Sequence, residues 1–170
     1  GTELREVRSY VRYENGIVEM DRTGFRQGTD GVVSASLRYD METQALSGAM
    51  DMENLDVPAL LALVNQKEDR IEGRITSHAT LGGTRENPAG TLTGTITEGK
   101  VAGYEVTDVA LDVALSAHVL TIRNLMGRQE GGSFSASGTI DFNGAIHVDA
   151  EAKDIALGIF TGLAGVDEPV

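Results

Sequence analysis

The sequence predicts a mostly β protein: an elongated, curled, antiparallel-rich sheet with one or two short helices. Three observations lead to this prediction. Apolar and polar residues alternate with period two along most of the chain, most clearly over residues 109–115. Asn-Gly pairs, which favour tight hairpin turns, occur at 15–16 and 143–144. Large side chains are scarce, with 5% aromatic residues, no Trp and 21 Gly, so a round core is hard to fill.

The remaining segments follow from the same patterns. Residues 22–30 are polar and fit no strand well. Residues 54–64 show apolar spacings typical of a helix, with Asp56 as its cap and Pro58 in its first turn. Asp154 opens a weaker, glycine-broken helix over 154–163. Strands are expected over 7–13, 18–20, 33–41, 46–52, 70–81, 92–96, 104–106, 109–115, 120–122, 134–142 and 146–152.

The two ends of the chain resemble each other. Residues 31–40 align with residues 132–141, and an Arg-Gln pair precedes each segment, ending at Gln27 and Gln129. A strand and then an Asp-capped helix are expected after each copy. We therefore predict that residues 1–170 are one fragment of a longer repeat protein, with approximate repeats over 4–64 and 109–163 joined by strands over 70–108.

Composition disfavours several functions. A net charge of −12 opposes binding to nucleic acid or to an anionic membrane surface. Cysteine is absent, and His78, His118 and His147 have no partner at metal-ligand spacing. The acidic residues near 51–56 and 68–72 are expected to be solvated. We expect no catalytic residue, no metal site, no cofactor and no enzyme activity.

Targeting signals are also not apparent. No stretch reaches the roughly 18 apolar residues of a membrane-spanning helix, and no signal peptide opens the chain. We expect any export or anchoring signal to lie outside this segment.

The apolar face of the expected sheet has many small residues, such as Ala35, Gly48, Ala79 and Gly94. Two arrangements fit this pattern: a sheet curled into an open apolar groove, or a filled sandwich or barrel in which small residues pack against large ones. The pattern does not choose between them. For an open groove, the predicted lining residues are Val33, Leu37, Leu92, Ile96, Val109, Leu111, Val113, Leu115, Leu120, Ile122, Phe134, Ala136, Ile140, Phe142, Ile146 and Val148.

The segment 72–88 resembles a recurring signature of TamB-like proteins, because residues 81–88 read Leu-x-Gly-Thr-x-x-Asn-Pro. Residues 90–96 and 132–144 are also similar to TamB and AsmA-type repeats, and residues 70–157 carry the most specific part of the likeness. The resemblance implies a long protein, anchored at the inner membrane of a double-membraned bacterium, that crosses the periplasm. It also implies a folded sheet known as a β-taco, and no catalytic residues.

Given this resemblance, we expect the groove to carry phospholipid acyl chains between the inner and outer membranes, as bridge-like lipid-transfer proteins do. An outer-membrane assembly protein is the expected partner of the full-length protein. Two alternatives remain: a scaffold whose open sheet edge templates strands of client outer-membrane proteins, and a surface β-repeat such as an adhesin stalk.

Overall fold

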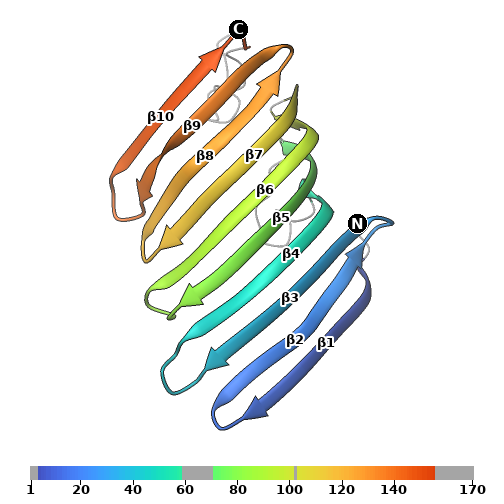
Figure 1. Ribbon diagram of the computed structural model, residues 1–170, viewed down its shortest axis with the longest axis vertical. Helices are drawn as coiled ribbons and strands as arrows, with labels where there is room; N and C mark the ends of the chain where they lie inside the picture. Colours follow the sequence, from blue (N-terminus) through green and yellow to red (C-terminus); the bar gives the residue numbers. More distant parts are fainter. Residues whose placement is uncertain (1–3, 59–70, 102, 156–170) are drawn as a thin grey trace, which may run out of the picture.

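A computed structural model describes residues 4–58, 71–101 and 103–155. These residues form one antiparallel sheet in which each strand pairs with its neighbours in sequence (Figure 1). The sheet is not closed into a barrel, and the predicted fold class is confirmed. The strands are β1 (Leu4–Glu14), β2 (Ile17–Gln27), β3 (Gly31–Asp40), β4 (Leu46–Asp56), β5 (Ile71–Gly83), β6 (Pro88–Val101), β7 (Tyr104–Ser116), β8 (Val119–Gln129), β9 (Gly132–Asp141) and β10 (Ile146–Lys153).

Both Asn-Gly pairs lie in hairpin connections, as predicted. Asn15 and Gly16 have φ angles of 48° and 77°, and Glu14 pairs with Ile17 across this two-residue turn. The left-handed conformation at both positions matches the twist of the flanking strands. The second connection is longer, because β9 ends at 141 and β10 begins at 146.

Several strands contain β-bulges. Glu6, Arg22, Asn54 and Asp108 have φ angles between 51° and 53°, and each lies at a break in the strand register. A bulge adds one residue to a strand, bends it and increases its twist. The polar segment 22–30 was expected to fit no strand, but β2 continues through its bulge to Gln27, so that expectation is wrong.

The predicted helix over 54–64 begins too early. β4 continues through Asp56, and Leu55 is a strand residue paired with Ile75. A helical turn starts only at Val57, and residues 59–64 lie outside the described part of the chain. In the second predicted helix, Asp154 and Ile155 are not helical, and residues 156–163 also lie outside the described part.

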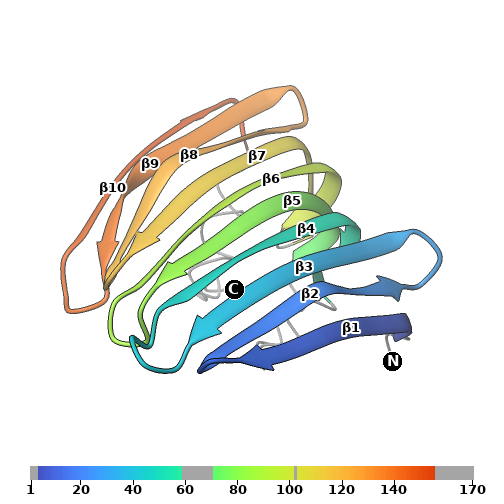
Figure 2. The same ribbon diagram turned by 60° about the horizontal axis from the view of Figure 1, so that its bottom comes forward.

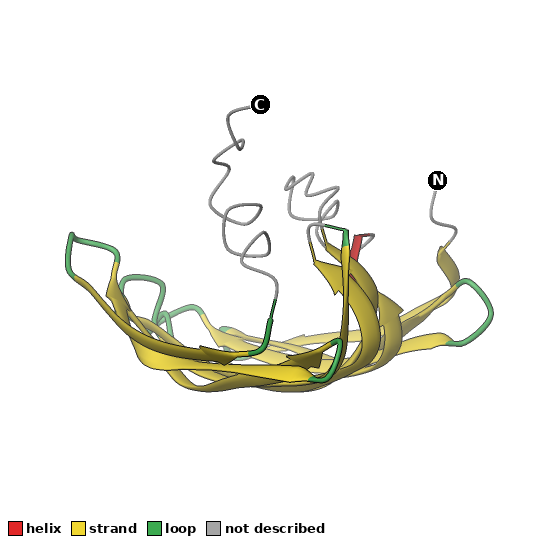
Figure 3. Ribbon diagram, turned by 90° about the horizontal axis from the view of Figure 1, so that it is seen from above, coloured by secondary structure: helices red, strands yellow, loops and turns green. Residues whose placement is uncertain are grey.

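The sheet curls into an open trough, with the strands running across it (Figures 2 and 3). Among the described residues, only Val33, Met52, Leu55 and Val106 are buried apolar residues. Val33, Met52 and Leu55 form one cluster, against which Phe25, Met50, Ile75 and Leu92 pack. Five neighbouring strands thus contribute to a single apolar cluster. The sheet brings these side chains together by curling toward the face on which they lie.

The two segments that resemble each other occupy corresponding places in the sheet. Gln27 ends β2 and pairs with Gly31, while Gln129 ends β8 and pairs with Gly132. Both glutamines are buried. The Gln27 Oε1 atom accepts a 2.7 Å hydrogen bond from the backbone N–H of Asp56, at the end of β4. The repeat itself stays a prediction.

Candidate apolar groove

The strand register gathers apolar side chains on one face of the sheet, which we call the apolar face. Residues directly opposite each other on paired strands project to the same side, so partners on successive strands form rows along the length of the sheet. The first row contains Met20, Leu37, Gly48, Leu81, Gly90, Leu115, Leu120, Ile140 and Ile146, and the second contains Ala35, Met50, Ala79, Leu92, Val113, Ile122, Gly138 and Val148. The third row contains Val33, Met52, Ser77, Gly94, Leu111, Leu125, Ala136 and Ala150. The fourth row contains Leu55, Ile75, Ile96 and Val109.

The register brings the predicted lining residues together. All of them except Phe142 lie on the apolar face, with Phe134 between Gly127 and Ala152 of the neighbouring strands. Phe142 follows the end of β9 in the connection to β10 and is 63% exposed. Several apolar-face residues of β2, β4, β5 and β8 were missing from the prediction. Most follow the same alternation and could have been found by it: Met20, Met50, Met52, Ile75, Leu81 and Leu125.

A hollow of about 380 Å³ lies on the apolar face between β2 and β5. Its walls are almost entirely apolar, and its volume falls within the roughly 300–1,000 Å³ typical of small-molecule sites. The side chains that line it include Met20, Ala35, Leu37, Met50, Ala79 and Leu81.

Glycines alternate with leucines in the first row because neighbouring strands approach closely there. A Cβ atom at Gly48 would lie 2.6 Å from the carbonyl oxygen of Ser36. A Cβ atom at Gly90 would lie 2.6 Å from the carbonyl oxygen of Thr80. Larger residues would push these strands apart, so the glycines permit the tight curl.

Exposure on the apolar face differs from strand to strand. Leu55 is completely buried, Leu81 is 41% exposed and Ile146 is 67% exposed. Side chains of this type normally lie in a core. Their exposure leaves a long apolar surface on which the described residues form no second layer.

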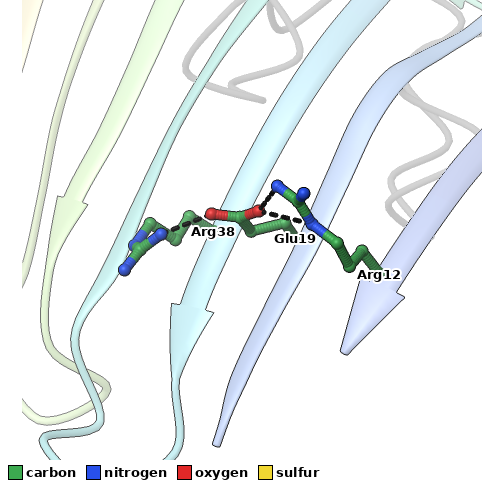
Figure 4. A network of polar contacts seen from close by, with 3 residues as sticks. All are labelled: Arg12, Glu19 and Arg38. Carbon is green, nitrogen blue, oxygen red and sulfur yellow. Dashed lines mark hydrogen bonds and ion pairs between the residues drawn. The ribbon is translucent and has the colours of Figure 1, made fainter. Parts of the chain in front are cut away.

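The opposite face, which we call the polar face, has side chains linked across strands. Glu19 on β2 lies between Arg12 on β1 and Arg38 on β3 and forms ion pairs with both (Figure 4). The hydrogen bond from Arg12 is the main reason that the pKa of the Glu19 carboxyl lies below its usual value. All three side chains lie on the water-facing side of an amphipathic sheet.

Further pairs continue this pattern on the polar face. His78 Nδ1 lies 2.6 Å from Asp51 Oδ1, and the hydroxyls of Thr80 and Thr91 are 2.7 Å apart. No group of His or acidic side chains among the described residues is arranged to hold a metal ion. Within that same part of the chain, no helix is long and apolar enough to cross a membrane.

A larger hollow, of about 940 Å³, lies beside β8, β9 and β10. Its lining mixes Phe134 with the charged residues Arg128, Glu151 and Lys153. These charged residues project to the polar face, so we do not include this hollow in the apolar groove.

The fold and its surfaces define an open, curled antiparallel sheet with one apolar and one polar face. Comparison of the chain with protein-family models, curated proteins and solved structures found no match.

Proposed function

We propose that the apolar face binds phospholipid acyl chains, and that the chain is a periplasmic segment of a TamB-like protein that carries lipid between the inner and outer membranes. The observation that supports this proposal most is the set of apolar rows, which continue across neighbouring strands. The likeness of residues 81–88 to the TamB-type signature supplies the lipid and the compartment. The proposal implies that inner-membrane anchoring comes from parts outside this segment.

The dimensions of the sheet support acyl chains as the ligand. The longest row crosses nine strands, from β2 to β10, and eight spacings of about 4.8 Å extend it roughly 38 Å along the trough. The hydrocarbon core of a bilayer, which holds two acyl chains end to end, is about 30 Å thick. One sheet of this length therefore accommodates acyl chains lying along its rows.

The energetics favour movement over tight binding. Burying one methylene group contributes about 0.8 kcal/mol, and a groove that covers one side of a chain provides roughly half of that. Ten methylenes then contribute about 4 kcal/mol, which corresponds to a Kd of about 1 mM. Because the rows contain no charged side chain, an acyl chain meets similar surfaces at successive strands.

The test places a charge on each face of one strand. Val113 lies on the apolar face between Leu92 and Ile122, whereas its neighbour Ala114 lies on the polar face between Thr91 and Thr121. Val113→Asp puts a carboxylate in the groove, where an acyl chain cannot solvate it. Ala114→Asp adds the same charge to the same strand and serves as the matched control.

Binding is measured with a phospholipid that carries a photoreactive acyl chain, and by the lipid that co-purifies with the protein. We expect cross-linking to Val113→Asp to fall at least tenfold, and Ala114→Asp to label like the original chain. Circular dichroism checks that both variants are folded. Equal labelling of two folded variants would refute the proposal.

The scaffold function has one specific observation in its favour. Among the described residues, no strand pairs with the outer edge of β10, and exposed edges accept extended peptides by strand addition. Photoreactive residues in β10 would then capture outer-membrane protein segments, with little lipid labelling at Val113.

A further inference from the structure

The outer edge of β10 has the features of a strand that pairs with another chain. All eight of its residues are exposed, and it pairs with β9 without a register shift. It contains no proline or bulge, two of the devices that protect natural sheet edges. At the opposite end of the sheet, β1 has an exposed edge, with Tyr13 67% and Val11 61% exposed.

Backbone geometry determines which groups of β10 point outward. The N–H of Asp141 donates to the carbonyl of Ala145 at 2.8 Å, and the carbonyl of Asp141 accepts from the N–H of Gly144 at 3.0 Å, so the Ala145 carbonyl points toward β9. Hydrogen-bonded and non-hydrogen-bonded pairs alternate along antiparallel strands. The N–H and C=O groups of β10 that point away from β9 therefore belong to Ile146, Val148 and Ala150, all on the apolar face.

The same reasoning applies to β1. Glu14 and Ile17 close a two-residue turn and so form a hydrogen-bonded pair. The outward groups of the regular part of β1 then belong to Tyr13, Val11 and Ser9. These residues also lie on the apolar face, so a β10–β1 pair can form all its hydrogen bonds and keep both apolar faces on one side.

We propose that β10 of one copy pairs antiparallel with β1 of a second copy, with Ile146 opposite Tyr13, so that the two troughs form one continuous groove. The direction is compatible because successive strands alternate in direction and β10 runs opposite to β1. The second copy thus continues the same meander. This proposal does not depend on the ligand of the groove.

Charge complementarity selects the register. With Ile146 opposite Tyr13, Glu151 lies opposite Arg8, and Asp149 lies opposite Tyr10 with Arg8 and Arg12 as its diagonal neighbours. Opposite charges across paired strands stabilise a sheet.

The pairing is less favourable when β10 is moved by two residues toward the start of β1. It places Glu151 opposite Glu6, and like charges in directly opposite positions destabilise a sheet. It also brings the register break between Arg5 and Arg8 further into the interface. The proposed register uses the bulge-free part of β1.

The first test removes one outward N–H. Proline is tolerated in an edge strand where its nitrogen faces solvent, so Val148→Pro should leave the sheet folded and block the pairing. We expect sedimentation to show association of the original chain that rises with concentration and is lost in folded Val148→Pro. Unchanged association of this variant would overturn the proposal and indicate another interface, such as two apolar faces stacked together. A chain that remains monomeric at millimolar concentration would also overturn it.

The second test uses the absence of cysteine, which makes any disulfide diagnostic. Chains carrying Tyr10→Cys are mixed with chains carrying Asp149→Cys and oxidised. This non-hydrogen-bonded pair brings Cα atoms to about 4.5 Å, within the range of a disulfide. We expect mixed dimers to predominate, and Ser47→Cys, in the interior of the sheet on β4, to form few with either chain. Equal yields from all combinations would overturn the proposed register.

Discussion

Truncating leucines at two places on the apolar face should separate the residues that hold the sheet together from those that bind ligand. Leu55 is fully buried within the cluster of β2–β6, whereas Leu81 is 41% exposed in the hollow. The same change, Leu to Ala, removes three carbon groups at either position.

The expected losses of stability differ by more than a factor of two. Three groups at about 0.8 kcal/mol each give about 2.4 kcal/mol for complete burial. At Leu55 the cavity left behind raises the cost of Leu55→Ala to about 3–4 kcal/mol. At Leu81 only about three fifths of the side chain is buried and water fills the space, so Leu81→Ala should cost roughly 1.4 kcal/mol.

Urea unfolding followed by circular dichroism measures both free energies, and phospholipid labelling is measured in parallel on folded protein. We expect Leu81→Ala to reduce labelling while most of the stability remains. Equal losses of stability at the two positions would refute the open trough, because they would mean that Leu81 is as deeply packed as Leu55.

Three further predictions concern stability. The Ser77 hydroxyl is buried without a hydrogen-bond partner among the described residues, so Ser77→Ala should raise the free energy of unfolding by about 1 kcal/mol; a loss would reveal a partner for the hydroxyl. Gly90→Ala should cost about 1–3 kcal/mol in urea unfolding, whereas Gly82→Ala, whose Cβ would have its nearest neighbour at 3.9 Å, should be nearly neutral. The hydrogen bond from the backbone N–H of Thr43 is the main cause that lowers the pKa of the Asp40 carboxyl. The stability that this bond contributes is complete above the usual pKa of about 4 and is lost as the pH falls through the lower pKa of the folded state. Asp40→Asn should therefore weaken the dependence of stability on acid pH, as measured in a pH series of thermal unfolding.

The sequence predicted the strands well wherever the alternation was regular. The apolar-face positions of β7 follow a strict period of two from Val109 to Leu115, and each was predicted to line the groove. An Asn-Gly pair between two alternating segments, as at 15–16, also has one common structural use, which is a two-residue hairpin turn. Local chemistry was sufficient to predict these elements.

The wrong expectations for the end of β4 and the second half of β2 share one physical cause, the β-bulge. At Asn54 the extra residue changes the spacing between apolar-face residues from two to three, from Met52 to Leu55. A spacing of three is also the spacing of a helical face, so the end of β4 resembled a helix. The bulge at Arg22 similarly separates Met20 from Thr23 and concealed the second half of β2.

The groove was the least predictable feature. Alternation indicates which residues share a face, but an open groove and a filled core place the same side chains inward. The difference depends on how closely strands approach, which Gly48 and Gly90 permit through contacts with backbone atoms of the preceding strand. Such contacts between strands are not visible in a single sequence.

The order of the strands also affects how the protein folds. Each strand of the described sheet pairs only with strands adjacent to it in sequence. The connection between β4 and β5 covers residues 57–70, and every other pairing closes a connection of only two to five residues. Folding rates rise as contacts become more local, and linear arrays can begin folding at any stable unit and grow outward. The two-residue turn at Asn15–Gly16 offers such a starting point. The sheet is therefore suited to grow one hairpin at a time as the chain emerges, before its last strand exists.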